Sequence, residues 1–212
     1  MIPTPIVQIE RNSVAVDADA MTLEWMRREF AKERCLLLRG FFSGDLLEMI
    51  WRRLRDAPFK ERIARRVSPP AVDLKLADAN LVGLLHFLLN DRAVIDFARQ
   101  VSGNPDATGF VGSVYRLVPG KDHRDSWHDD VDGNRLAALT INLSQEEFEG
   151  GELEMRQNGG GEAQWRIANT GPGDGLLFAI APGLQHRIRP VVGTTPKTAL
   201  AGWFCRDADL HL

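Results

Sequence analysis

The part of the chain that follows Pro105 alternates short β-type runs with glycine turns. The turn glycines include Gly120, Gly133, Gly150, Gly171 and Gly193. The runs between them predict strands over 108–118, 126–131, 136–143, 152–157, 164–168, 175–180, 186–192 and 197–205. Eight short strands separated by such turns are typical of a jelly roll. This pattern excludes a mainly helical fold for the second half of the chain.

The first hundred residues have a different pattern, with apolar residues at helical spacing. They predict helices from residue 17 to about 34, from Ser43 to about 57, over 79–90 and over 91–101, with a buried strand in CLLLRGFF between the first two. A basic segment contains Lys60, Arg62, Arg65 and Arg66; a solvated helix face is the simpler interpretation and a phosphate-binding surface the alternative. We therefore predict one catalytic unit over 1–212, with a mostly helical support region over 1–104 packed on a β core over 105–212.

Charge and composition limit the partners and the compartment. Lys plus Arg total 26 and Asp plus Glu total 29, so a net charge of -3 provides no attraction to nucleic acid or an anionic membrane. No apolar run approaches the roughly 20 residues of a membrane span, and the start lacks the pattern of a secretory signal. Only Cys35 and Cys205 are present, too few for a disulfide framework. We expect a cytoplasmic protein that binds neither nucleic acid nor membrane.

Two histidines and an aspartate have the spacing of a metal site. His128 and Asp130 are two residues apart, so on a strand both side chains point to the same face. His186 begins a later apolar strand that could fold back beside His128. Two imidazoles and one carboxylate form the facial triad of non-haem Fe(II) oxygenases, which leaves adjacent coordination positions open.

A 2-oxo acid can occupy two of those open positions, and the distal carboxylate of 2-oxoglutarate (2OG) then needs a fixed cation. Lys197 begins the last strand after a turn that follows the strand of His186, so a hairpin would place it beside that strand. Arg187 and Arg189 are competitors, but alternation points both away from the face of His186.

The motifs in the second half follow one another in a specific order. They are VPG (118–120), HDD (128–130), RLAALTINLS (135–144), EGGELEMR (149–156), GDGLLF (173–178), HRIRPV (186–191) and KTALAGWF (197–204). In this order they resemble the 2OG- and Fe(II)-dependent oxygenases, in particular the prolyl 4-hydroxylase-like branch. The resemblance implies a mainly β fold with α, a double-stranded β-helix with the N-terminal helices packed on its major sheet. It also implies His128, Asp130 and His186 as iron ligands and Lys197 as the 2OG anchor, with Asn142 and Thr140 as further co-substrate contacts.

The chain departs from the family pattern at a few positions. Relatives often have a tyrosine just before the Pro-Gly turn, whereas Leu117 and Val118 stand there and Tyr115 lies further back. A second H-x-D, His123 and Asp125, precedes the first; family spacing favours His128 and places His123 in a loop. Trp127 and Trp203 are interpreted as core packing.

The resemblance implies a hydroxylase that releases succinate and CO2 and that uses ascorbate to restore over-oxidised iron. Its substrate would be a peptide or a small molecule, with a preference for a prolyl or other amino-acid side chain. The sequence leaves the oligomeric state open, a homodimer included. Two other classes stay open, a cupin-type metalloenzyme and a non-catalytic jelly-roll binding module; bound iron with 2OG dependence would distinguish the oxygenase from both.

Overall fold

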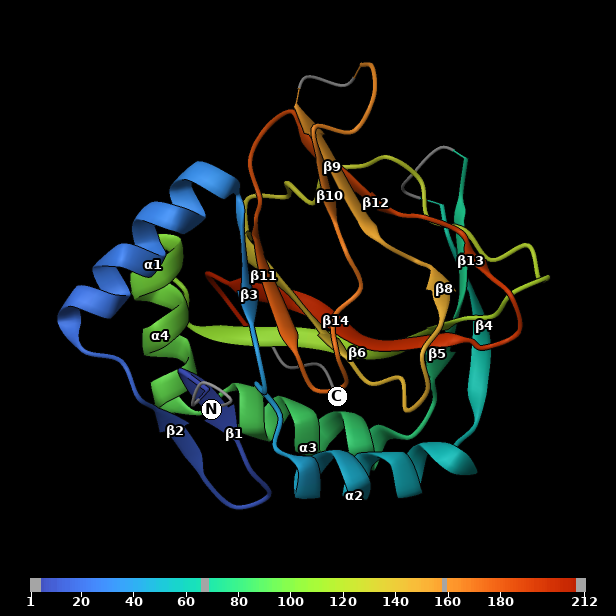
Figure 1. Cartoon of the computed structure of the whole chain (residues 1–212), viewed down its shortest axis with the longest axis horizontal. Coiled ribbons are helices and arrows are strands. Elements are labelled where there is room, and N and C mark those ends of the chain that lie inside the picture. The colour runs from blue at the N-terminus through green and yellow to red at the C-terminus, as the bar shows by residue number, and fades with distance from the viewer. Residues whose placement is uncertain (1–4, 66–68, 158–159, 209–212) are drawn as a thin grey trace.

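A large antiparallel sheet forms the centre of the molecule (Figure 1). The computed structural model describes residues 5–65, 69–157 and 160–208. Within these residues the main sheet has seven strands in the order β3-β11-β7-β14-β6-β5-β4. Their bounds are Cys35–Leu38 (β3), Gly175–Ala179 (β11), Arg135–Asn142 (β7), Lys197–Cys205 (β14), Gly109–Leu117 (β6), Ala71–Leu76 (β5) and Phe59–Ala64 (β4).

A smaller sheet faces one side of the main sheet (Figure 1). It comprises β10 (Trp165–Ile167), β9 (Leu153–Gln157) and β12 (Leu184–Ile188), and β8 (Glu149–Gly150) pairs separately with β13 (Val191–Val192). Between the sheets lies a small core that joins Ala138, Leu176 and Phe178 to Leu153 and Met155. The predicted jelly roll is confirmed.

Helices cover the opposite side of the main sheet. They are α1 (Ala20–Glu33), α2 (Gly44–Arg55), α3 (Ala79–Leu89) and α4 (Arg92–Ser102), and their positions confirm the predicted helices. Their apolar faces pack on Phe110, Leu139, Ile141 and Leu200 in the larger core. Because strand side chains alternate, the residues between these, such as Ala138 and Thr140, face the smaller sheet. No helix within the described residues is long and apolar enough to span a membrane.

Aspartates cap the starts of three of the four described helices. The side chains of Asp19, Asp78 and Asp91 accept backbone N–H bonds in the first turns of α1, α3 and α4, which satisfies donors that have no partner inside the helix. A two-stranded hairpin, β1 (Val7–Ile9) and β2 (Val14–Val16), precedes α1.

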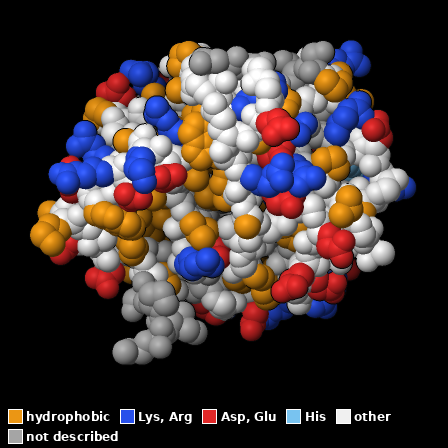
Figure 2. All heavy atoms as spheres, turned by 45° about the horizontal axis from the view of Figure 1, so that its top comes forward, with side chains coloured by type: hydrophobic (Ala, Val, Ile, Leu, Met, Phe, Trp, Pro, Cys, Tyr) orange, Lys and Arg blue, Asp and Glu red, His pale blue; other side chains and the backbone are white. Residues whose placement is uncertain are grey.

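On the face shown in Figure 2, acidic and basic side chains are intermingled.

Two predicted elements were wrong, the helix in the basic segment and the strand over 126–131. The basic segment is not a helix: residues 59–64 form β4, which pairs with β5, and Arg66 lies outside the described residues. Cross-strand pairing, including an ion pair of Arg62 with Asp73, outweighs the weak helical pattern. The β1–β2 hairpin and β5 were not anticipated either.

Residues 126–131 do not form a strand. Only His128 pairs there, in an isolated bridge to His186. The following segment turns because the Asp132 carboxylate accepts the backbone N–H groups of Asn134 and Arg135, which competes with ladder formation.

Candidate metal centre and co-substrate pocket

His128, Asp130 and His186 converge, although the first two lie on a loop. One ligand atom from each lies within 4.8 Å of the others. The Nε2 atom of His186 is 3.4 Å from Oδ2 of Asp130, and Nε2 of His128 is 3.8 Å from Oδ1. Reciprocal backbone bonds of 3.1 and 2.8 Å between His128 and His186 fix the loop against β12. The geometry therefore brings together the three residues that the sequence selected.

The hydrogen bond of His128 and the low pKa of His186 suit metal binding. Nδ1 of His128 is 2.6 Å from the Ser126 carbonyl oxygen, so it donates its hydrogen there and leaves the Nε2 lone pair facing Asp130. Burial lowers the pKa of His186 to about 4. Two neutral imidazoles and a carboxylate are a donor set that fits Fe(II).

Asp130 is held by two donors that the sequence analysis did not assign to the site. Nη1 of Arg135 is 2.9 Å from Oδ1, and Nε1 of Trp203 donates to Oδ2 at 2.7 Å. The Arg135 guanidinium also lies 3.6 Å over the Trp203 ring. Trp203 is therefore a polar partner of a metal ligand as well as a packing residue. Trp203 lies an even number of residues after Lys197 on β14. This spacing placed both side chains on the same face of the strand and could have indicated that Trp203 is part of the site.

The second H-x-D has a structural role. Nδ1 of His123 accepts the backbone N–H of Val118 at 2.9 Å, which closes the Pro-Gly turn. The Asp125 carboxylate accepts the N–H groups of Ser126 and Ile188, each at 2.9 Å, and burial raises the pKa of this carboxyl. Asp125 thus joins the ligand loop to β12, while neither residue belongs to the group of converging ligand atoms found within the described residues.

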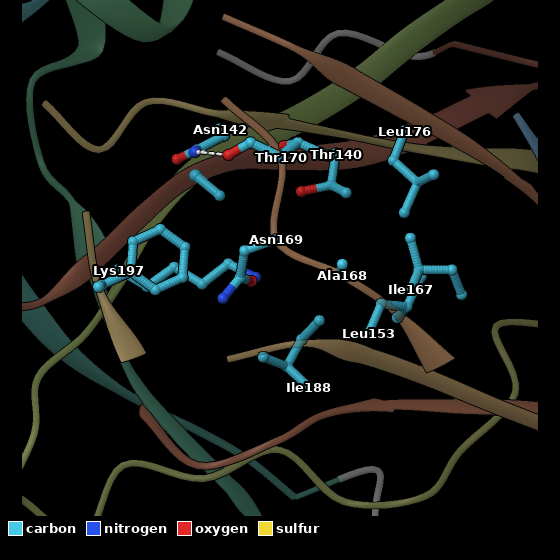
Figure 3. Close-up of a pocket in the computed structure, with 12 residues that line it drawn as sticks. Thr140, Asn142, Leu153, Ile167, Ala168, Asn169, Thr170, Leu176, Ile188 and Lys197 are labelled. Atoms are coloured by element: carbon cyan, nitrogen blue, oxygen red, sulfur yellow. Dashed lines mark hydrogen bonds between the residues drawn. The ribbon is translucent and has the colours of Figure 1, made fainter. Parts of the chain in front are cut away.

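Lys197 lies in a buried pocket between the two sheets (Figure 3). The pocket is also lined by Thr140, Asn142, Leu153 and Ile188, among others. Ile188 is two residues from His186 on β12, so the pocket adjoins the metal ligands. Burial lowers the pKa of Lys197 to about 8, against the opposing charges of Glu152 and Asp125. A half-buried ammonium in a pocket lined by both polar and apolar side chains is suited to a carboxylate.

The neighbouring backbone is shaped to the lysine. Nζ of Lys197 donates to the Gly151 carbonyl. Gly151 has φ +72°, and a Cβ atom there would come within 3.0 Å of Cδ of Lys197. A side chain at this position would be strained and would displace the lysine.

The two predicted accessory contacts differ. Thr140 and Asn142 both line the pocket. The Asn142 amide is already bonded, however: Nδ2 donates to the Thr170 carbonyl at 2.6 Å, and Oδ1 accepts from the Ser144 N–H at 2.9 Å. Asn142 therefore fixes the pocket wall, whereas Thr140 points into the pocket.

The arginines that follow His186 point away from the pocket, as alternation predicts. Nε of Arg187 is 2.9 Å from Oε2 of Glu154, and Nε of Arg189 is 3.9 Å from Oε1 of the same residue. Trp127 has the Arg156 and Arg187 guanidiniums at 4.2 and 4.6 Å from its ring centroid. It is a half-buried stacking residue between cations rather than a core residue.

Comparisons with known proteins agree with this geometry. Residues 112–205 match the family model of the 2OG-Fe(II) oxygenase superfamily, and no curated protein matches the sequence. An oxidoreductase of the 2OG-Fe(II) oxygenase family from Burkholderia pseudomallei is similar in structure, with a TM-score of 0.69 and 15% identity, over 94% of this chain and 96% of that one.

Two prolyl hydroxylases also share the fold. A prolyl-4-hydroxylase from Pseudomonas putida has a TM-score of 0.63 and 16% identity over 86% of this chain and 98% of its own. A Trichoplax adhaerens prolyl hydroxylase, solved with a hypoxia inducible factor peptide fragment, has the same TM-score and identity over 89% and 94%. The matched segment contains the metal-ligand triad and Lys197, so the family model, the fold and the site together indicate an oxygenase that depends on Fe(II) and 2OG.

Proposed function

We propose that this protein hydroxylates an unactivated C–H bond of a prolyl or other amino-acid side chain. The substrate and O2 react with 2OG to yield the hydroxylated product, succinate and CO2, so that one oxygen atom enters each of the product and succinate. The observation that carries the proposal is the pocket of Lys197, which adjoins the His128–Asp130–His186 triad on the inner face of the jelly roll.

The residues of the site have separate roles in this reaction. When bound, Fe(II) and 2OG supply the oxidising chemistry, which no protein side chain can provide. His128, Asp130 and His186 would hold the metal, and Trp203 and Arg135 keep the Asp130 carboxylate in place. Lys197 pairs with the distal carboxylate of 2OG. The apolar walls formed by Leu153, Leu176 and Ile188 exclude water from this ion pair.

The choice of an amino-acid side chain has support from similarity alone. The proteins of similar fold include prolyl hydroxylases, one of them solved with a peptide. We also propose ascorbate as the reductant that restores over-oxidised iron, by resemblance to prolyl hydroxylases, and a cytoplasmic location. An assay with and without ascorbate, and fractionation of cells, test these two points.

Anaerobic visible absorption tests the proposed function without knowledge of the substrate. The protein is titrated with Fe(II) and then with 2OG, and a saturable charge-transfer band of the chelated keto acid is expected. Asp130→Ala should abolish the band. Asp129→Ala, which changes the adjacent exposed aspartate, is the matched control and should retain it.

Two results would contradict the proposal. Bound iron without a band on addition of 2OG would favour the cupin-type metalloenzyme. Absence of bound iron would favour a non-catalytic jelly-roll module.

A further inference from the structure

The β4–β5 hairpin extends the main sheet beyond the co-substrate pocket. Figure 1 shows it at the edge of the sheet remote from β3. Arg62 on β4 lies opposite Asp73, Lys75 on β5 lies opposite Tyr115, and Tyr115 lies opposite Ala199 on β14. Opposed residues in an antiparallel sheet share a face. The hairpin therefore presents Arg62 on the same face as Lys197, which is two residues before Ala199.

Arg62 is held rigidly by its neighbours. Its Nε atom donates to Oδ1 of Asp73 at 2.9 Å, and its Nη2 atom donates to Oδ2. The guanidinium lies 4.5 Å from the centroid of the Tyr115 ring. Asp73 is 7% exposed, whereas the Arg62 side chain is 38% exposed. Nη1 of Arg62 forms no hydrogen bond with the described residues. The N–H groups of this nitrogen can therefore donate to a ligand.

This face of the hairpin carries an excess of positive charge. Lys60 lies opposite Lys75, and both are exposed. Together with Arg62 they are opposed on this face of the two strands only by Asp73, because Glu61 of β4 lies on the other face. Two strands that place like charges opposite one another lose stability, which a bound anion would recover. Lys60 and Arg62 of the basic segment therefore lie on the face of the sheet that also carries Lys197.

The hairpin lies against the loop that carries the metal ligands. Val72 and Arg124 exchange two backbone hydrogen bonds of 2.9 Å, and Oγ of Ser126 donates to the Pro69 carbonyl at 2.7 Å. Ser126 precedes His128 by two residues. Burial raises the pKa of the Tyr115 phenol, on which the charges of both Arg62 and the ligand Asp130 act. The cationic face therefore borders the metal centre.

We propose that this face binds a carboxylate of the primary substrate, so that the substrate is a free amino acid or its N-acyl derivative rather than an internal peptide segment. The inference rests on the proposed function and refines it. Nη1 of Arg62 donates to the carboxylate, while Lys60 and Lys75 attract it. The backbone of an internal peptide segment would offer only neutral amides, whereas a free amino acid always carries the α-carboxylate that this cationic face favours.

The test uses the full chain loaded with Fe(II) and 2OG. Free L-amino acids and their N-acetyl derivatives are each compared with the corresponding C-terminal amide, and succinate formation is measured. We expect at least one acid to stimulate succinate formation, and its amide to require an at least about tenfold higher concentration, because a charged hydrogen bond is lost.

Variants locate the effect on the hairpin. Lys75→Gln changes an exposed residue and should raise the KM for the acid about threefold by removing a nearby charge. Arg62→Lys keeps a cation beside Asp73 but loses the planar fork, and it should lower kcat/KM for the acid about tenfold. Arg52→Gln, at an exposed site on α2, is the control and should change neither value.

Acids and amides acting alike, no stimulation by any member of the panel, or an unchanged KM in both variants would overturn this inference. The charge-transfer band of the wild-type protein distinguishes a wrong substrate class from a wrong proposed function. If the band is present, only the substrate class is wrong; if it is absent, the proposed function itself fails.

Discussion

The hydrogen-bond partner of Nδ1 distinguishes a metal ligand from a structural histidine in this protein. His128 and His123 both precede an aspartate by two residues. Nδ1 of His128 contacts a carbonyl, which leaves Nε2 free to coordinate, whereas Nδ1 of His123 accepts a backbone N–H. Motif order selected the pair that converges with His186, but neither the tautomer nor its partner can be deduced from a sequence.

This difference predicts the response to histidine removal. His128→Ala should weaken Fe(II) binding strongly, because only two of the three ligands remain. Loss of a residue that hydrogen-bonds to a ligand typically weakens metal binding roughly 10- to 100-fold, and the loss here should be larger. His123→Ala should retain Fe(II) binding close to the wild-type affinity. Equilibrium titration with Fe(II) under anaerobic conditions measures both. Similar losses in the two variants would contradict the assignment of His128.

Lys197 predicts a pH dependence of co-substrate binding. Burial lowers its pKa to about 8, so the ammonium is fully charged only below that value. Since the cationic form pairs with the carboxylate, 2OG affinity should be constant below about pH 8 and fall about tenfold for each pH unit above it. Titrations of the charge-transfer band between about pH 6 and pH 10 measure this, with the range set by the shifted pKa.

Two variants test whether the lysine causes this dependence. Lys197→Ala should bind 2OG weakly at every pH. Lys197→Arg keeps its charge throughout and should give a flat profile. A decline above pH 8 that persists in Lys197→Arg would assign the titration to another group.

Strand β14 carries residues of both the co-substrate pocket and the metal centre. Lys197, Ala199, Ala201 and Trp203 alternate on its inner face. The lysine serves the co-substrate and the tryptophan holds Asp130, while the short alanines leave space between them. The strand and its lysine were predictable from pattern and motif. The role of Trp203 was not, because an apolar strand pattern reports burial and contains no information about an indole N–H partner.

Trp203→Phe tests this arrangement. Oδ2 of the buried Asp130 would lose its 2.7 Å donor, so Fe(II) affinity should fall about 10- to 100-fold while the fold persists. Trp51→Phe is a matched control, because Trp51 donates from Nε1 to the Leu143 carbonyl at 3.0 Å. It loses an equivalent bond in the other core and should bind Fe(II) normally. Equal losses in the two variants would mean that Trp203 acts only through general stability.

Elements that depend on distant partners were the ones that the sequence did not predict. β4 has no clear period of its own, and its pairing with β5 and the attachment of β5 to β6 determine its conformation. Conversely, 126–131 has the composition of a strand but is shaped by local bonds from the backbone N–H groups of Ser126 and Val131 to the carboxylates of Asp125 and Asp129. The helices were predictable because their caps and apolar stripes are local features.

Both halves of the chain contribute strands to the main sheet. β3 pairs with β11 at one edge, and β5 and β4 extend the sheet beyond β6 at the other. The outer face, with Phe110, Ile141 and Leu200, is covered by helices from the first hundred residues. The division into a support region and a catalytic core is thus a division of sequence patterns, while the packing joins the two parts.

This organisation predicts that residues 105–212 do not fold alone. The fragment would retain the triad and Lys197 but would expose the apolar outer face and lose the strands at both sheet edges, which costs far more than the few kcal/mol of a domain's net stability. We expect the full chain to unfold in one cooperative transition by circular dichroism and tryptophan fluorescence, and the fragment to show neither a transition nor saturable Fe(II) binding. A fragment that unfolds cooperatively and binds Fe(II) would show that the first hundred residues are an accessory layer rather than part of one catalytic unit.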